Sequence, residues 1–273
     1  FTDSAGNNNS ASNTFTWTFD GTAPIITSIL PSWSSYLNAT EDNNSGTVTV
    51  TTSGVEDGQI LTITLNGTNY TGSISSNSVT ITISATDLQE LTEGTNTITA
   101  NVSDAVGNAA SEASTTFIYD KTAPSISSII PSWGSVLNAT EDNSNGTVTV
   151  STSGVEDGQT VTIVLNSISY TGSISNNSTS ITISSSNLQN LINNTVYTIT
   201  ADVSDVAGNS ANQSSTTFTY RIPSISSITP NWGTYLNSTE DNSDGTVTVV
   251  TTNVEDNQTL TIGLNGTNYT GLT

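Results

Sequence analysis

Acidic side chains recur at a few fixed positions along this chain, and their type and spacing could do chemistry. Carboxylate oxygens together with backbone carbonyls are the ligands that Ca²⁺ prefers. Paired carboxylates can also hydrolyse glycosides, but that reaction needs one pair in one cleft, whereas these pairs recur. The pattern therefore favours cation binding or solvated loops over catalysis. The recurring acids are Glu41–Asp42, Glu141–Asp142 and Glu240–Asp241; Glu56–Asp57, Glu156–Asp157 and Glu255–Asp256; Asp104 and Asp205; and Asp20 and Asp120.

The rest of the composition excludes most kinds of enzyme. The 273 residues include 23 acidic and two basic residues, and the net charge of −21 has the wrong sign for binding nucleic acid or an anionic membrane surface. Without Cys there is no disulfide or thiolate zinc site, and without His there is no serine–histidine dyad. No apolar stretch is long enough to span a membrane. We expect no catalysis, no nucleic-acid partner and no membrane insertion.

The acidic positions recur because the whole sequence repeats. Trp33, Trp133 and Trp232 lie in SILPSWSSYLNATEDN, SIIPSWGSVLNATEDN and SITPNWGTYLNSTEDN, spaced by 100 and then 99 residues. This spacing predicts the end of one repeat at 1–20, whole repeats at 21–120 and 121–220, and half of a further repeat at 221–273. The chain shows no export signal at its start, so we expect a mature product or a segment of a longer protein.

Each repeat is predicted to consist almost entirely of β-strands. Runs such as TVTVTT and LTITLN alternate apolar and hydroxyl residues with period two, as half-buried strands do. The Ser- and Asn-rich composition alone would also suit disorder, but disorder would not place this alternation in register in every repeat. One helical turn is expected at ATDLQEL and SSNLQNL, with Asp87 or Ser186 near the N-cap. Seven short strands per repeat predict tandem immunoglobulin-like β-sandwiches of about 100 residues in an extended rod.

The order of these motifs resembles the bacterial immunoglobulin-like repeats of giant surface adhesins and biofilm-associated proteins. The resemblance is carried by LNATEDN, SGVEDGQTVTIVLN, the YTGSI strand, the LQELTEGTNTITANVSDAVGN block and the FIYDKTAP junction. It implies an all-β fold, a stalk that projects a binding tip away from the cell, and calcium at the junctions. The Pro-Ser-Trp segment departs from that pattern, and so does the last junction, Tyr220–Pro223, which has lost both the Asp and the Thr-Ala spacer.

An immunoglobulin topology places the incoming linker beside the loops that hold the recurring acids. Asp20 should therefore approach Glu56, Asp57 and Asp104, and Asp120 should approach Glu156, Asp157 and Asp205. Either group would supply hard oxygen ligands for Ca²⁺. The alternative is that these acids are solvated and keep the surface soluble. At the last junction Arg221 stands in place of Asp120, so we expect it to pair with Glu255 or Asp256 and to exclude calcium. Lys121, which stands beside Asp120, can pair with a carboxylate in the same way but more weakly.

The three Trp residues allow two interpretations. Each indole can pack over an open end of its own sandwich, with its N–H bonded locally. Alternatively it can contact a neighbouring chain or stack on a sugar.

The sequence as a whole predicts an extracellular, cell-surface structural segment whose partners are neighbouring repeats and a target reached through a distal tip. A second hypothesis is a self-assembling filament subunit, in which residues 1–20 of one copy complete the half-repeat 222–273 of another by strand addition. A third is a glycan-binding accessory module.

Overall fold

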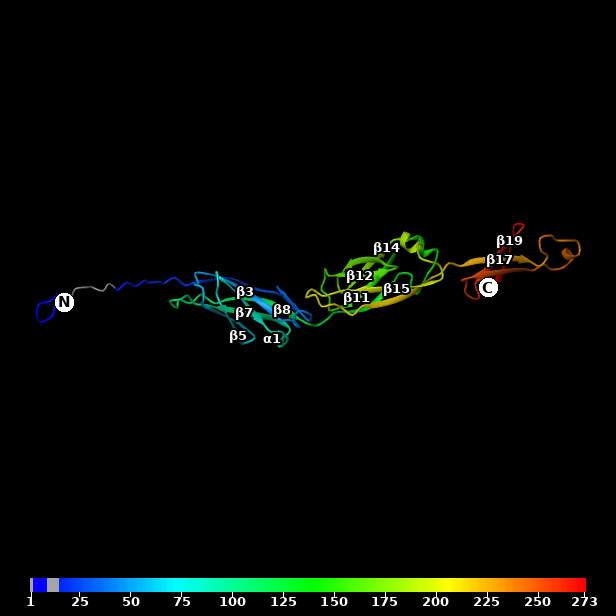
Figure 1. Cartoon of the computed structure of the whole chain (residues 1–273). Coiled ribbons are helices and arrows are strands. Elements are labelled where there is room, and N and C mark those ends of the chain that lie inside the picture. Colours follow the sequence, from blue (N-terminus) through cyan, green and yellow to red (C-terminus); the bar gives the residue numbers. More distant parts are fainter. Residues whose placement is uncertain (1, 9–14) are drawn as a thin grey trace. The chain divides into compact units, whose positions relative to one another are not determined.

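The computed structural model describes residues 2–8 and 15–273, and Figure 1 traces the chain. The chain divides into two compact units, Phe1–Thr122 and Ala123–Thr273, which are described separately below. Nearly all regular structure is β-strand, as the alternating sequence predicts. No helix in the described part of the chain is long and apolar enough to cross a membrane.

The first unit contains a two-sheet sandwich with the strand order of an immunoglobulin-like domain. Its smaller sheet has the order β1-β3-β6 and its larger sheet the order β2-β8-β7-β4-β5. A short helix, α1, joins β6 to β7. The elements are β1 (Ile25–Pro31), β2 (Tyr36–Asn38), β3 (Gly46–Ser53), β4 (Ile60–Leu65), β5 (Thr68–Ser73), β6 (Ser78–Ile83), α1 (Ala85–Gln89), β7 (Gly94–Asn101) and β8 (Ala113–Asp120).

The second unit begins with the same sandwich. Its sheets have the orders β14-β11-β9 and β10-β16-β15-β12-β13, which match those of the first unit strand for strand. The elements are β9 (Ser125–Pro131), β10 (Val136–Leu137), the 3₁₀ turn Glu141–Asn143, β11 (Gly146–Ser153), β12 (Thr160–Leu165), β13 (Ile168–Ser173), β14 (Ser178–Ile183), α2 (Ser185–Gln189), β15 (Thr195–Asp202) and β16 (Ser214–Tyr220).

The remaining part of the second unit forms two hairpin-like pairs. β17 (Ser224–Pro230) pairs with β18 (Val247–Thr252), and β19 (Thr259–Leu264) pairs with β20 (Thr267–Leu272). A 3₁₀ turn at Glu240–Asn242 precedes β18. These pairs correspond to the first strands of a complete repeat, and their apolar faces are more exposed than the buried faces of the sandwiches.

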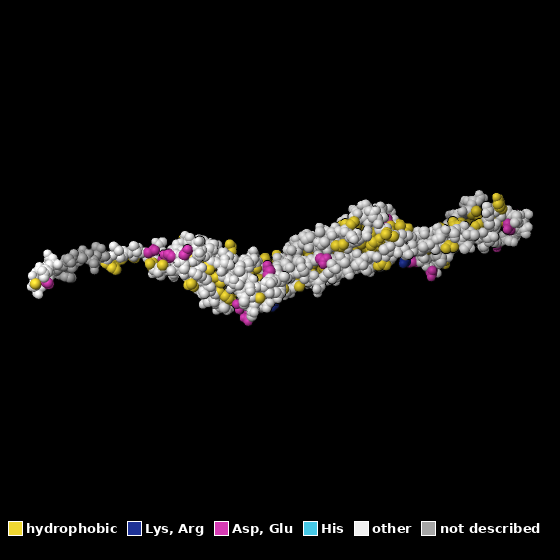
Figure 2. All heavy atoms as spheres, in the orientation of Figure 1, with side chains coloured by type: hydrophobic (Ala, Val, Ile, Leu, Met, Phe, Trp, Pro, Cys, Tyr) yellow, Lys and Arg dark blue, Asp and Glu magenta, His cyan; other side chains and the backbone are white. Residues whose placement is uncertain are grey.

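Alternation between buried and exposed residues explains why these segments form strands. In β3, Val48 and Val50 are fully buried while Thr47 and Thr49 are only half-buried. Successive side chains point to opposite faces of a strand, so valine fills the core and threonine covers the outer face. In Figure 2 the visible face consists mostly of backbone and uncharged side chains, with hydrophobic patches and scattered acidic side chains between them.

Each complete repeat has eight strands rather than the seven predicted, because the first strand is divided between the two sheets. β1 pairs antiparallel with β3, whereas β2 pairs parallel with β8. The turn between them follows Pro31 and includes Ser34, whose φ of 58° lies in the left-handed region. Proline has no N–H to continue the ladder, which suits a position where the chain leaves one sheet.

Trp33 and Trp133 pack inside their own sandwiches. Trp33 is 5% exposed, and its ring meets the ring of Phe117 edge-on at a centroid distance of 5.2 Å. A Cβ on Gly46 would lie 2.4 Å from the indole, so glycine is required there. The prediction of packing is therefore confirmed, but the prediction of a locally bonded N–H is wrong. Nε1 of Trp33 and of Trp133 is buried and has no hydrogen-bond partner.

The N-caps of the short helices lie three residues earlier than predicted in the first repeat and two residues earlier in the second. The Ser84 hydroxyl accepts a hydrogen bond from the N–H of Asp87, and Ser184 does the same for Asn187. Ser84 and Ser184 are therefore the N-caps, in place of Asp87 and Ser186. The side chain that satisfies a free N–H of the first turn stands before the helix, and serine is well suited to this position.

Candidate functional site

The linker enters the first sandwich at the end that carries two acidic loops. The side-chain amide of Asn108 donates to the backbone carbonyl of Asp20 at 3.2 Å. The N–H of Ala105 donates to the Glu56 carboxylate at 2.9 Å. Asp20, Glu56 and the turn after Asp104 therefore meet at one end of the sandwich, as the topology argument expects. This end, formed by residues 20, 54–58 and 104–108, is called the entry pole below.

Asp104 organises the turn at the entry pole. One of its carboxylate oxygens accepts from the N–H groups of Val106 and Asn108, and the other accepts from the Asn108 amide at 2.7 Å. Burial pushes the pKa of Asp104 upward, but these hydrogen bonds outweigh burial and hold it below its usual value. The Asp-x-x-Gly-Asn sequence thus encodes a self-capped turn whose carboxylate is ionised at neutral pH.

Asp57 and Asp20 use their carboxylates within their own segments. Asp57 accepts from the N–H of Ser76 at 2.7 Å, in the loop that leads into β6. The Asp20 carboxylate accepts from the N–H of Thr22 at 2.9 Å. Among residues 2–8 and 15–273, no three acidic side chains gather in an arrangement that could hold a metal ion. The four predicted ligands lie around one pole, and each of their carboxylates accepts a hydrogen bond from a backbone N–H group.

The second unit repeats these contacts at equivalent residues. Glu156 accepts from the N–H of Val206 at 2.9 Å, and Asp157 accepts from the N–H of Asn176 at 2.8 Å. Asp205, 3% exposed, accepts from the N–H and the amide of Asn209. Asp120 belongs to the first unit, where it accepts from the N–H of Thr122 at 3.0 Å. Its predicted approach to Glu156, Asp157 and Asp205 stays a prediction.

Arg221 does not make the predicted contact through its Nε atom. That atom is buried and has no hydrogen-bond partner. The backbone N–H of Arg221 instead donates to the carbonyl of Leu137 at 2.9 Å, which continues the pairing of β10 with β16. Lys121 lies over the ring of Tyr119, two residues earlier in the chain, with its ammonium 5.7 Å from the ring centre.

Sequence reasoning missed a buried tyrosine–aspartate pair in each complete repeat. The Tyr119 hydroxyl donates to the Asp42 carboxylate at 2.6 Å, and Tyr220 donates to Asp142 at 2.5 Å. Asp42 and Asp142 are each 5% exposed. Burial, followed by the hydrogen bond and charge of the carboxylate, raises the pKa of Tyr119 and raises that of Tyr220 to about 12. The available signal was that Asp and Tyr recur at fixed positions in both repeats.

Comparison with known proteins found no matching family model and no matching curated protein. Several solved structures are similar. One is described as a Ca²⁺-stabilized adhesin of an Antarctic bacterium that binds ice, with 23% identity and a TM-score of 0.47 over 99% of this chain and 68% of that one. Another comes from a 1.5-MDa bacterial ice-binding adhesin, with 23% identity and a TM-score of 0.45 over 87% and 79%. Fibronectin(III)-like modules of Clostridium thermocellum CbhA match with 11% identity and a TM-score of 0.43 over 73% and 94%.

These neighbours include bacterial immunoglobulin-like domains and repeats of large adhesion proteins. The fold assignment, however, follows from the chain's own topology. Two sheets in the orders β1-β3-β6 and β2-β8-β7-β4-β5 enclose one apolar core, and the second unit repeats them. The chain is therefore an all-β protein that contains immunoglobulin-like sandwiches in tandem.

Proposed function

We propose that the chain is a structural segment of an extracellular stalk, in which immunoglobulin-like repeats follow one another and calcium at the junctions limits bending. The observation that carries the proposal is the entry pole. There the carbonyl of Asp20, the Glu56 carboxylate and the Asp104 turn are linked through Asn108 and Ala105. The pole joins the linker to the repeat that follows it, which is where bending has to be controlled.

The residues of the pole suit calcium in their chemistry. Carboxylates and backbone carbonyls are hard oxygen donors, and the chain has two basic residues to balance 23 acidic ones. Asp20, Glu56, Asp57 and Asp104 would hold an ion at the first junction. Asp120, Glu156, Asp157 and Asp205 would hold one at the second. An ion would supply positive charge between acids that otherwise repel each other.

The third junction is proposed to bind no calcium. Arg221 replaces the aspartate there, and its charge opposes a cation. Titration of the chain with Ca²⁺ should therefore give about two sites, one for each linker that carries aspartate.

The test is small-angle X-ray scattering with calcium and with a chelator. Removing calcium should shorten the mean end-to-end extension by loosening the first two junctions, while far-UV circular dichroism shows that the sandwiches remain folded. Asp20→Asn should remove one calcium site in the titration. Glu90→Gln, which follows α1 at the opposite end of the sandwich, should remove none. An unchanged scattering profile on chelation would contradict the role of calcium.

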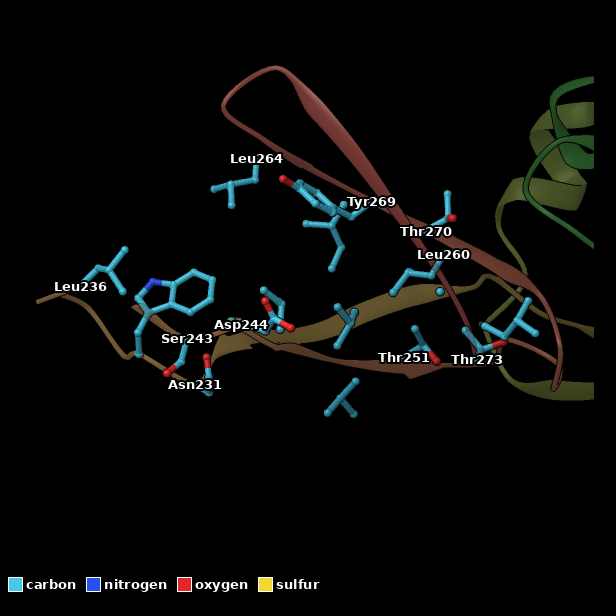
Figure 3. A pocket seen from close by; sticks show the side chains of 18 of the residues that line it. Asn231, Leu236, Ser243, Asp244, Thr251, Leu260, Leu264, Tyr269, Thr270 and Thr273 are labelled. Carbon is cyan, nitrogen blue, oxygen red and sulfur yellow. The ribbon is translucent and has the colours of Figure 1, made fainter. Parts of the chain in front are cut away.

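A second candidate function is association between copies, and exposed apolar surface favours it. Phe15, Trp17 and Phe19 are 88%, 72% and 84% exposed, and they alternate as the residues of β8 do. The half-repeat 222–273 has an open cleft of about 1360 Å³ between its strand pairs, lined by both apolar and polar residues. Figure 3 shows Leu236, Leu260, Leu264 and Tyr269 around it. Concentration-dependent polymerisation in analytical ultracentrifugation would support strand addition, and a monodisperse monomer would exclude it.

In the two complete repeats, the indoles of Trp33 and Trp133 are buried in their own sandwiches, so they are not available to stack on a sugar or to contact a neighbouring chain. Trp232 differs, because it is half-buried and lines the open cleft of the half-repeat.

A further inference from the structure

The linker that leaves the first sandwich is held by a residue of the loop before β7. One oxygen of Glu93 accepts hydrogen bonds from the backbone N–H of Lys121 at 3.0 Å and from the Thr122 hydroxyl at 2.9 Å. The position follows from strand pairing. Gly94 begins β7 opposite Tyr119 near the end of β8, so Glu93 stands beside the residues that follow β8.

The second sandwich holds its outgoing linker in the same place with a different side chain. The N–H of Ile222 donates to the side-chain oxygen of Asn193 at 2.7 Å. The carbonyl of Ile222 accepts from the amide of Asn253 at 3.2 Å and, more weakly, from that of Asn193 at 3.5 Å. Ile222 also packs against the core of the second sandwich.

The two contacts are equivalent although the linkers are not. Glu93 and Asn193 both stand two residues after the buried leucine that follows the short helix, Leu91 or Leu191. Each precedes a residue with positive φ, Gly94 or Asn194, which turns the chain into the next strand. Residues 121–124 join β8 to β9, whereas 221–223 join β16 to β17. The contact is kept while linker length and sequence change.

We propose that Glu93 and Asn193 are linker clamps: side chains that fix the first residues of each outgoing linker to the sandwich it leaves. The proposal requires neither calcium nor the stalk function, because every contact lies within one unit. It adds a second determinant of junction stiffness, placed at the opposite end of the sandwich from the entry pole.

The two clamps should respond differently to acid. The N–H of Lys121, then the Thr122 hydroxyl and the charge of Lys121, lower the pKa of Glu93. A lowered pKa means that the contact is complete above the ordinary glutamate value of about 4.3 and is lost as the pH falls through the lowered value. Two titratable groups that interact with Glu93 are Lys121 and Tyr119. Asn193 is an amide and does not titrate.

The chain carries its own reporter for both clamps. Lys121 and Arg221 are its only basic residues, so trypsin can cut only Lys121–Thr122 and Arg221–Ile222. Each bond lies in one clamped segment. A protease requires the segment to leave the sandwich and extend into its active site, so the rate of each cut reports how often that segment opens.

The experiment compares the two cutting rates in one digestion of the whole chain, followed by intact-mass spectrometry. Glu93→Ala should raise cutting after Lys121 by about threefold or more, the effect of losing an exposed hydrogen-bonded contact, and leave cutting after Arg221 unchanged. Asn193→Ala should do the reverse. Glu93→Gln keeps an acceptor without the charge, so it should give a smaller increase than Glu93→Ala.

Amide chemical shifts between pH 6 and pH 3 test the difference in acid response. The Lys121 amide should shift with the titration of Glu93, the shift should vanish in Glu93→Gln, and the Ile222 amide should not follow it. Equal acceleration of both cuts by either alanine variant would mean general destabilisation and would overturn the proposal. So would unchanged rates in both variants.

Discussion

Single residues distinguish the two complete repeats most clearly at the hairpin between the fourth and fifth strands. The first repeat uses Asn66–Gly67, with φ of 48° and 76°, and the second uses Asn166–Ser167, with φ of 48° and 63°. A two-residue turn with two positive φ values matches the twist of the flanking strands. Glycine adopts this conformation without strain, whereas serine does not.

Ser167→Gly should therefore stabilise the second repeat. We expect a gain of about 0.5–1 kcal/mol, because the strain of a left-handed serine exceeds the entropy that glycine adds to the unfolded chain. Hydrogen exchange of the β12–β13 peptides, followed by mass spectrometry, should slow. The reciprocal change Gly67→Ser should speed exchange in β4–β5. A shift in the same direction for both variants would contradict the argument from φ.

At the scale of elements, the tyrosine–aspartate pair ties the last strand of each sandwich to the loop between its second and third strands. Tyr220 lies at the end of β16, and Asp142 lies in the 3₁₀ turn before β11. The neutral hydroxyl donates to the buried carboxylate, so ionisation of the tyrosine removes the bond and sets two negative charges side by side. The fold is thus sensitive to base at this tie.

Folding stability should fall as the pH rises from about 10 to about 12. The pKa of Tyr220 is raised to about 12 in the folded state, while an unfolded tyrosine titrates near 10. Its contribution is complete below pH 10 and is lost as the pH rises through the folded value.

Thermal unfolding followed by circular dichroism at several pH values tests whether folding stability falls as the pH rises. The double variant Tyr119→Phe/Tyr220→Phe should be less stable at pH 8, by roughly 1–3 kcal/mol for each buried partner left unpaired, yet should lose less stability above pH 10. Tyr235→Phe, at an 85% exposed position, serves as the control. Parallel curves for the double variant and the wild type would contradict the assignment.

The strands could be predicted from the sequence, but several side-chain roles could not. Alternation in TVTVTT and the Asn66–Gly67 turn indicate strands and a hairpin because local pattern determines both. The division of the first strand depends on which sheet the chain pairs with after Pro31, and that is a long-range property. The sequence also cannot distinguish a buried Asp42 from a solvated loop acid.

The candidate site shows the same limit. Topology correctly places Glu56 and Asp104 near the incoming linker, but the direction of each carboxylate depends on which N–H group is nearest. Asp57 turns to Ser76 for this reason. Glu93 was overlooked because it does not recur as an acid. Its equivalent is Asn193, and only the structure shows that both side chains accept a hydrogen bond from a backbone N–H of the outgoing linker.

At the scale of the whole molecule, the two basic residues stand beside the junctions, and neither lies in a sandwich strand. The rest of the surface in Figure 2 is largely uncharged, with acidic side chains between. The junctions therefore differ from the sandwich strands in carrying the positive charge of the chain.

The division of the first strand also determines how a repeat bears tension. The chain enters at the start of β1 and leaves at the end of β8, and β2 runs parallel to β8. Force applied to the two ends therefore slides β2 along β8 and loads their hydrogen bonds together, in shear. In a second geometry, one handle stays at the end of β8 and the other is attached at the Asn66–Gly67 turn. Because β5 pairs only with β4, this force breaks the β4–β5 hydrogen bonds one at a time. Single-molecule pulling should give a higher rupture force in the end-to-end geometry, and equal forces would contradict this load path.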